Sequence, residues 1–348
     1  MVNNGHEEYK IMSETVNRAW TMASRPEGEP AAENFALVES PVQVANHGEV
    51  LIRTLYLSLD PYMRGRMRGG PSYAATLEPG DMMIGEVVAR VEQSESPLYK
   101  VGDIVRSSIG WQEWAVVPAH DVRPVNPDLG PISTGVGVLG MPGMTAYFGL
   151  LEVLKPGAGD TLVVSAASGA VGAVVGQIGK INGCFVIGVA GSDEKCAYLI
   201  DELGFDGSIN YKTQDVSAEL VRLSPSGVNV YFDNVGGPIA DAVMENLALK
   251  GRIAICGQIS QYNAATPQMG PRNFSVMTRM RARIEGFLVY DFELQHEIAR
   301  VRISNWIKDG RIKYKEDIVD GFENAPSAFA GLFRGDNFGK LLVKVSDE

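Results

Sequence analysis

Residues 161–195, TLVVSAASGAVGAVVGQIGKINGCFVIGVAGSDEK, decide the fold of this chain. The stretch opens with a short apolar run at 162–164, passes through a turn of small residues, and then places apolar side chains at helical spacing from Val171 to Ile181. A second β-branched run follows at 184–189. This order predicts a strand, a tight turn, a helix and a strand, a βαβ unit of about 30 residues that is typical of half a dinucleotide-binding domain. The sheet that it starts is therefore expected to be parallel.

The turn at 167–172, ASGAVG, matches the G-x-G-x-x-G pattern with Ala in the first place. Gly169 and Gly172 fill the places where the backbone approaches a pyrophosphate and where a helix packs closely on a strand. A glycine pattern alone also fits a plain loop, but the flanking strands favour a dinucleotide site. Because free N–H groups at the start of the helix face the phosphates, we expect contacts from Gly169, Ala170, Val171 and Gly172.

The end of the second strand selects between NAD and NADP. An NAD site usually offers a carboxylate about 20 residues after the turn, where it binds the ribose 2′-hydroxyl. Here that place holds Gly191 and Ser192, with Lys195 three residues further on. Gly leaves room for a 2′-phosphate and Lys neutralises it, so the pattern favours NADP(H). Two alternatives stay open: Asp193 can bind a ribose, and Lys195 can be a solvated lysine of a first helical turn.

Composition sets the class of protein. A chain of 348 residues suggests about two domains, and a net charge of −11 argues against nucleic acid as the main partner. No apolar run reaches the ~18 residues of a membrane span, and residues 1–10 carry no apolar signal segment, so we expect a cytoplasmic protein without a membrane partner. The cysteines and histidines are scattered without metal-ligand spacing, which predicts reduced thiols and no metal site.

Residues 16 to about 130 contain short β-like runs, at 18–23, 50–59, 84–91, 103–107 and 111–117. Their spacing predicts a compact, mostly antiparallel barrel or sandwich. Tyr62 lies just past one of these runs, in DPYMR (60–64). A tyrosine in such a loop can enter a cleft, and it can equally be a rim tyrosine that packs on the barrel.

From residue 138 the pattern changes to alternating helices and strands. Helices are expected from 138 to the turn at 155–157 and at 194–203, 215–223 and 238–249, and strands at 208–210, 228–233, 252–256 and 284–290. With the first two strands this makes six, the number in a full doubly wound sheet. Ligands bind at the carboxyl ends of such strands, where the chain places DNVGG (233–237), CGQISQY (256–262) and GFLV (286–289). Each is an ordinary strand-to-loop transition, and together they outline a cofactor cleft.

These motifs carry a family resemblance. The chain resembles the zinc-independent medium-chain dehydrogenase/reductases of the leukotriene B4 dehydrogenase and prostaglandin reductase type, and especially the NADPH-dependent curcumin reductases. The matching motifs cover the chain from about residue 16 to its end: LSLDPYMRGRM (57–67), LGMPGMTAY (139–147), AASGAVG (166–172), GVAGSDEK (188–195), NYKT (210–213), FDNVGG (232–237), CGQISQYN (256–263), DGFENAP (320–326) and GDNFGK (335–340).

The resemblance implies an α/β fold in which a Rossmann NADPH-binding domain, 138–310, is inserted into a GroES-like barrel domain built from 1–137 and 311–348. Residues 339–345, GKLLVKV, would then form a strand that rejoins the barrel. Lys195 and Tyr211 would hold the 2′-phosphate. The other implied NADPH contacts are those of the phosphate turn and Asn234, Cys256, Gly257, Gln258, Ile259, Ser260, Gln261, Tyr262, Phe287, Leu288, Val289 and Asn337.

The activity that the resemblance implies is reduction of the carbon–carbon double bond of an α,β-unsaturated ketone or aldehyde, with hydride passing from NADPH to the β-carbon. The zinc ligands of the alcohol dehydrogenase relatives are missing, so charge on the carbonyl oxygen needs other hydrogen-bond donors. Tyr262 and Tyr62 are the expected donors, because a phenol with a pKa of about 10 stays protonated at neutral pH. Tyr262 or solvent would give the α-carbon its proton.

Two rival functions remain open from the sequence, a quinone reductase and a non-catalytic NADPH-binding structural or sensor protein. Both expected tyrosines and an intact phosphate turn favour catalysis. We also expect a homodimer, because the last strand of the parallel sheet would lie at its edge with apolar side chains, and an exposed apolar edge is usually paired or covered.

Overall fold

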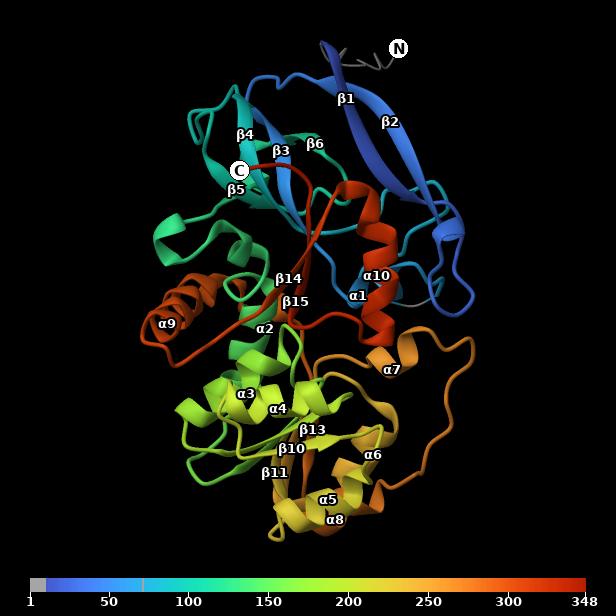
Figure 1. Ribbon diagram of the computed structural model, residues 1–348, viewed down its shortest axis with the longest axis vertical. Helices are drawn as coiled ribbons and strands as arrows, with labels where there is room; N and C mark the ends of the chain where they lie inside the picture. Colours follow the sequence, from blue (N-terminus) through green and yellow to red (C-terminus); the bar gives the residue numbers. More distant parts are fainter. Residues whose placement is uncertain (1–10, 71) are drawn as a thin grey trace, which may run out of the picture.

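The computed structural model describes residues 11–70 and 72–348, and the expectation for residues 1–10 falls outside this part of the chain. Two large sheets lie one in each half of the molecule, and the junction between them is bordered by α1 (Tyr62–Arg66), α7 (Ile259–Tyr262) and α10 (Ala325–Arg334) (Figure 1). The α/β class with a parallel and a mostly antiparallel sheet is thus confirmed.

Within residues 72–348 the parallel sheet has six strands, in the order β10-β9-β8-β11-β12-β13. The chain starts at the centre, winds out to one edge and returns to build the other half, which is the doubly wound order. The strands are β8 (Thr161–Ser165), β9 (Phe185–Ala190), β10 (Gly207–Asn210), β11 (Val228–Asp233), β12 (Leu247–Ile255) and β13 (Arg283–Gly286).

Helices cover both faces of this sheet because side chains alternate along each strand. In β8, Leu162 and Val164 belong to one hydrophobic core, whereas Val163 between them belongs to another. The first core packs against α2 (Met141–Phe148), α3 (Gly172–Ile181) and α9 (His296–Lys308), and the second against α5 (Val216–Leu223), α6 (Gly237–Glu245) and α8 (Ser275–Met280). The π-helical turn Gly149–Leu154 continues α2, and α4 (Asp193–Asp201) follows β9.

Among the described residues, seven strands form the second sheet, and its neighbours are antiparallel except for the last two strands of the chain, which pair in parallel. Its strands are β3 (Glu49–Ser58), β4 (Val87–Ser94), β5 (Ile104–Ser107), β6 (Trp114–Pro118), β7 (Arg123–Pro124), β14 (Glu316–Asp320) and β15 (Lys340–Lys344). A separate ribbon of β1 (Ile11–Met22) and β2 (Phe35–Gln43) lies beside it (Figure 1).

The C-terminal strand rejoins the N-terminal part of the chain, as expected. β15 pairs antiparallel with β3, with Val343 opposite Leu57. The helix α10 packs on the same core, where the ring centroids of Phe329 and Trp111 are 5.5 Å apart in an edge-on contact. The parallel sheet is therefore built from a segment that leaves the second sheet after β7 and returns to it at β14.

The last strand of the parallel sheet was wrongly placed by the sequence pattern. The apolar run 284–290 predicts a strand as far as Tyr290, but β13 ends at Gly286 and the chain continues as a 3-10 helix, Val289–Gln295. Among the described strands, β13 pairs only with β12, and the last residue pair of this ladder is Ile255 with Gly286. Because β12 ends there, residues 287–290 have no neighbouring strand in the described part of the chain to pair with and do not continue β13.

Smaller differences concern where elements begin. Tyr62 does not lie in an open loop, because residues 62–66 form one helical turn. The helix expected from 138 begins at Met141, after a 3-10 turn at Ile132–Val136 and with Pro142 in its first turn, where the missing N–H costs nothing. The strand β2, the helices α9 and α10 and the strand β14 had not been predicted from the sequence pattern.

Candidate active site

The phosphate turn joins β8 to α3 as the sequence predicts. Ala166 takes a left-handed backbone conformation, with φ of 48°, and its carbonyl accepts a hydrogen bond from the Gly169 N–H at 3.0 Å. A methyl group on Gly172 would collide with that carbonyl and with the Ala167 Cα, so Gly172 permits close packing of the helix on the strand. At Gly169 a methyl would approach the same carbonyl oxygen at 3.2 Å. The turn is thus a tight cradle built on backbone.

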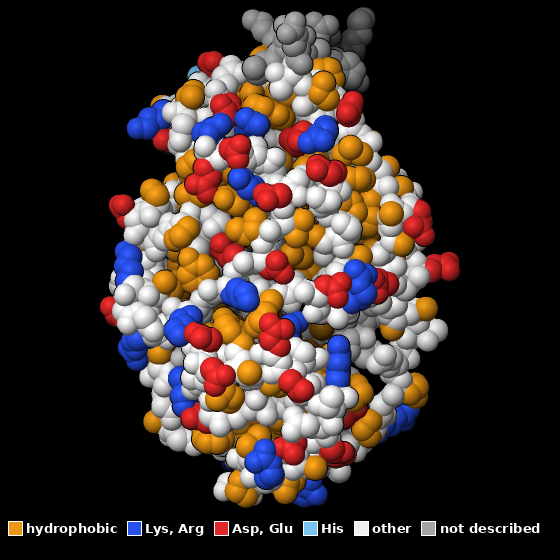
Figure 2. All heavy atoms as spheres, viewed as in Figure 1, with side chains coloured by type: hydrophobic (Ala, Val, Ile, Leu, Met, Phe, Trp, Pro, Cys, Tyr) orange, Lys and Arg blue, Asp and Glu red, His pale blue; other side chains and the backbone are white. Residues whose placement is uncertain are grey.

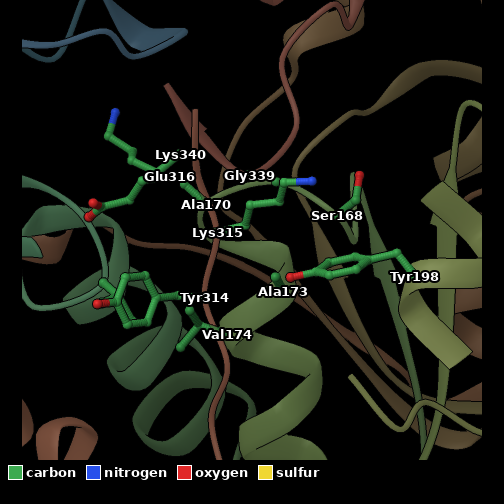
Figure 3. Close-up of a pocket in the computed structure, with 12 residues that line it drawn as sticks. Ser168, Ala170, Ala173, Val174, Tyr198, Tyr314, Lys315, Glu316, Gly339 and Lys340 are labelled. Atoms are coloured by element: carbon green, nitrogen blue, oxygen red, sulfur yellow. The ribbon is translucent and has the colours of Figure 1, made fainter. Parts of the chain in front are cut away.

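A small pocket lies between the phosphate turn and the C-terminal part of the chain (Figure 3). Ser168, Gly169 and Ala170 line one side, and Lys315, Gly339 and Lys340 line another. Gly169 and Gly339 form an isolated parallel β-bridge, which ties the turn to the start of β15. The segment that returns to the second sheet therefore borders the phosphate turn.

The expected 2′-phosphate end is assembled at the carboxyl ends of β9 and β10. A Cβ at Gly191 would lie 3.1 Å from the hydroxyl oxygen of Tyr211, so these two residues are neighbours. Ser192 caps α4 by accepting a hydrogen bond from the Lys195 N–H, and the Lys195 Nζ donates to the Gly335 carbonyl at 2.7 Å. Burial lowers the pKa of Lys195, and the charge of Lys212 lowers it further. Lys212, which the sequence analysis did not single out, thus adds a second cation.

The carboxyl ends of β8, β11 and β12 are held by Asp233, which is 1% exposed. Its Oδ1 accepts hydrogen bonds from the N–H groups of Val235 at 3.0 Å and Gly236 at 2.9 Å. The amide of Asn234 donates to the Ser165 carbonyl at 2.8 Å, so this expected cofactor residue uses its side chain to join two strand ends. The turn is consequently rigid, and the groups that remain for a ligand are mainly backbone.

The expected contacts 256–262 follow β12 and enter α7. The Ser260 hydroxyl donates to the Val235 carbonyl at 2.6 Å, which fixes α7 on the turn after β11. Burial raises the pKa of the Cys256 thiol to about 12, so this cysteine is a neutral thiol at physiological pH. The remaining members of this run are Gly257, Gln258, Ile259 and Gln261, at the start of α7 and before it.

Tyr262 ends α7 with its hydroxyl directed back along the helical turn. Its oxygen accepts a hydrogen bond from the Gln258 N–H at 3.2 Å, and a Cβ at Gly257 would lie 3.1 Å from it. Burial raises the pKa of the Tyr262 phenol, while the Gln258 bond lowers it to a lesser extent. The hydroxyl therefore keeps its proton at neutral pH and can donate it in a hydrogen bond.

Tyr62 begins α1, on a turn that is held by a buried ion pair. The Lys340 Nζ donates to Asp60 Oδ1 at 2.9 Å and to the Leu59 carbonyl at 2.8 Å, and Ser58 donates to the other oxygen of Asp60. Burial raises the pKa of the Tyr62 phenol far above its ordinary value, and the charges of Asp60 and Glu86 raise it further. Tyr62 is thus a second phenol that stays protonated.

Three further residues influence the pKa of these phenols. The charge of Tyr73 raises the pKa of both Tyr62 and Tyr262, less than burial does. Tyr290 and Glu86 each raise the pKa of Tyr62, and burial raises the pKa of the Glu86 carboxyl itself, which Arg106 partly offsets. Sequence reasoning did not find Glu86, because a glutamate in a strand pattern indicates a solvent-facing position.

The remaining expected cofactor residues lie after β13 and next to the phosphate turn. Phe287 packs its ring 6.1 Å from that of Phe232, and Val289 is buried in the same core, whereas Leu288 between them is 38% exposed. Asn337 donates its amide to the Gly339 carbonyl at 2.8 Å, next to the phosphate turn. Because the side chains of Phe287 and Val289 pack in the core, only their backbone groups remain to contact a ligand.

Within residues 11–70 and 72–348, no group of three His, Cys, Asp or Glu side chains is arranged to hold a metal ion. The same part of the chain contains no helix that is both long and apolar enough to cross a membrane. On the face seen in Figure 2, acidic and basic side chains are interspersed and form no basic patch.

The doubly wound sheet carries a glycine-containing phosphate turn, and the second sheet is built from segments before and after it in the chain. This combination defines a dinucleotide-binding oxidoreductase fold. Family models agree: the N-terminal domain of oxidoreductase matches residues 18–125, and the zinc-binding dehydrogenase model matches residues 170–303.

Individual relatives narrow this class. The chain is 44% identical over 344 residues to the NADPH-dependent curcumin reductase of Escherichia coli (strain K12), covering 95% of this chain and 98% of the relative. It is 44% identical over 333 residues to prostaglandin reductase 1 of Rattus norvegicus, covering 94% and 99%. The crystal structure of CurA from Vibrio vulnificus in complex with NADPH superposes with a TM-score of 0.90 at 44% identity, covering 95% and 100%. The chain belongs to the zinc-independent medium-chain dehydrogenase/reductases of the curcumin reductase and prostaglandin reductase type.

Proposed function

We propose that this protein reduces the carbon–carbon double bond of α,β-unsaturated ketones and aldehydes with NADPH. The observation that carries the proposal is the Tyr262 phenol, which is kept protonated at the carboxyl end of β12, where a doubly wound sheet binds its ligands. The relatives support it: the chain is 44% identical to the curcumin reductase and 46% identical, over 303 residues, to the NADP(+)-dependent 2-alkenal reductase of Nicotiana tabacum.

The residues present fit NADPH. The phosphate turn is a cradle that a side chain at Gly172 would fill, and the missing side chain of Gly191 lets the Tyr211 ring pack against the backbone after β9. We propose Lys195 and Tyr211, with Lys212 nearby, as the 2′-phosphate site. The other proposed contacts are those that the family resemblance implies, from the phosphate turn, the residues after β11 and β12, the segment 287–289 and Asn337.

When bound, NADPH supplies the hydride that reaches the β-carbon. The chain's own part is to stabilise the negative charge that then develops on the carbonyl oxygen. Tyr262 and Tyr62 donate hydrogen bonds to that oxygen, because both phenols keep their protons at neutral pH. The α-carbon takes its proton from Tyr262 or from solvent.

A single assay compares the candidate functions. NADPH oxidation is followed by its absorbance with an enone, with a quinone and without an acceptor, and NADH is run in parallel. We expect rapid oxidation with the enone and much slower oxidation with the quinone. Turnover of the quinone alone would replace this proposal with a quinone reductase, and binding of NADPH without turnover of either acceptor would indicate a non-catalytic NADPH-binding protein.

We also propose the division into a barrel domain of 1–137 and 311–348 and a Rossmann domain of 138–310. Its support is the composition of the two sheets, since β3 to β7 and β14 to β15 share one sheet and β8 to β13 form the other. A cytoplasmic location is proposed because Cys184, Cys196 and Cys256 are free thiols, which suits a reducing compartment. Cell fractionation with a reductase assay would test the location.

A homodimer is proposed through the edge of the parallel sheet. β13 is the edge strand, and apolar side chains near it are exposed, among them Ile284 at 37% and Tyr290 at 57%. An exposed edge with apolar side chains is usually covered by another chain. Light scattering should give twice the chain mass, whereas 37.6 kDa at micromolar concentration would contradict a dimer.

A further inference from the structure

One side chain links the two short helices that carry the proposed hydrogen-bond donors. Arg64 lies in α1, two residues after Tyr62, and its Nε donates to the side-chain oxygen Oδ1 of Asn263 at 3.1 Å. Asn263 directly follows Tyr262 and caps the end of α7. The two partners are 199 residues apart in sequence, and they join the second sheet's half of the molecule to the parallel sheet's half.

The remaining bonds of Arg64 anchor its guanidinium on the barrel side. Nη2 donates to the carbonyls of Gly28 at 2.9 Å and Pro26 at 3.2 Å, so the group is fixed before it reaches Asn263. Arg64 is 3% exposed, and its Nη1 is buried without a hydrogen-bond partner. A buried guanidinium with so few acceptors gains from each one that it has, because an unsatisfied charged donor is costly to bury. Burial and, to a lesser extent, the charge of Arg68 together lower the pKa of Arg64 to about 10.

The position of this bond limits what can move. α1 and α7 are single short turns: Tyr62 begins α1, with Arg64 two residues further on, and Tyr262 ends α7, with Asn263 as the next residue. A rotation of either turn would move its tyrosine and break the bond between Arg64 and Asn263. Hydrogen bonds to a developing oxyanion work only when the donors are already aimed at its position.

We propose that the Arg64–Asn263 hydrogen bond, here called the clasp, holds the hydroxyls of Tyr62 and Tyr262 so that both point at one substrate oxygen. Arg64 and Asn263 are then positioning residues for the reduction. This inference rests on the proposed function of the two tyrosines. A simpler role for Arg64, holding the loop at Pro26 and Gly28, predicts that Asn263 is dispensable.

The test uses Asn263→Ala in the full-length protein, because that change leaves the other bonds of Arg64 intact. We expect turnover of an enone at saturating NADPH to fall about tenfold, which is within the range for misplaced catalytic groups, with NADPH affinity unchanged within about twofold. Asn263→Asp keeps an acceptor for the guanidinium and should retain most of the turnover. Arg25→Gln is the matched control: Arg25 donates to the Met67 carbonyl beyond the other end of α1 and pairs with Glu78, and both of these bonds stay within residues 25–78.

A double-mutant cycle separates positioning from general loosening. In a Tyr62→Phe background, Asn263→Ala should cost less than about twofold in turnover, because the clasp then has one donor left to align. If Tyr62→Phe and Tyr262→Phe impair the enone reaction but Asn263→Ala is silent, or if its effect multiplies fully with that of Tyr62→Phe, the clasp is refuted and the tyrosines stand. If neither tyrosine variant impairs the reaction, the proposed function of the tyrosines fails and the clasp fails with it.

Discussion

The two ends of the proposed cofactor and substrate cleft are built on different physical principles. At the phosphate end, the Lys195 ammonium group donates to a carbonyl and Tyr211 is 45% exposed. The positive charge of Lys195 therefore lies close to solvent. At the acceptor end, burial is the largest cause of the raised pKa of both Tyr62 and Tyr262. Burial is also the largest cause of the lowered pKa of Lys195, but there it weakens a charge, whereas at the acceptor end it keeps two phenols neutral. The first end is therefore expected to set cofactor affinity, and the second to set the rate.

The largest effect is expected from Tyr262→Phe. Turnover of an enone should fall about 10²–10³-fold, the usual loss for one oxyanion donor, while NADPH affinity changes little because the ring and the phosphate contacts remain. Steady-state kinetics with an enone and with a quinone would measure this. Tyr99→Phe is a control, since it removes a phenol that donates to the Val122 carbonyl within the barrel. Unchanged turnover of the enone by Tyr262→Phe would remove this residue from the mechanism.

Lys195→Ala tests the other end of the comparison. NADPH affinity should fall about tenfold to a hundredfold, the cost of a charge-assisted bond to a phosphate, and NADH affinity should change little. Titration of both cofactors by fluorescence would measure it. Lys313→Ala is a matched control, because that exposed lysine pairs with Glu202 at 2.8 Å. An equal loss for NADPH and NADH would contradict the assignment of the 2′-phosphate to Lys195.

Tyr62→Phe should reduce enone turnover less than Tyr262→Phe does, by about tenfold or less, since one strong donor remains on the oxygen. The double variant should then lose less than the product of the two single losses, because both donors serve one oxygen. The measurement is kcat for the four proteins of the cycle. Fully multiplicative losses would show that the tyrosines act on different atoms.

The smallest effect is a difference in pH dependence. Burial raises the pKa of both tyrosines above 10, so both phenols keep their protons at neutral pH. The contribution of these phenols to turnover at saturating NADPH should therefore stay constant from pH 7 to about 9. Burial lowers the pKa of Lys195 below 10.5, so its charge is lost first as pH rises. The Kd for NADPH should therefore rise by a few-fold in the alkaline range before turnover falls. The reverse order of loss would contradict the comparison of the two ends.

Local pattern was sufficient for the parallel sheet. The strand at Val228–Asp233 has the expected bounds, and the phosphate turn joins β8 to α3 as its small residues indicate. The reason is that βαβ units are encoded by periodicity over short stretches, which a strand–turn–helix sequence displays directly. The same pattern failed beyond Gly286, because an apolar run does not reveal where the neighbouring strand ends.

The sequence by itself determined the doubly wound sheet and the turn between β8 and α3, and its family motifs predict the roles of the two tyrosines. Only the tertiary structure decided what holds those tyrosines. The Asp60–Lys340 ion pair joins residues 280 apart, the Arg64–Asn263 bond joins residues 199 apart, and the pKa of the Glu86 carboxyl is raised by desolvation in the completed fold. Such contacts leave no periodic trace, because burial and pairing of a single polar side chain depend on which distant elements the completed fold brings beside it.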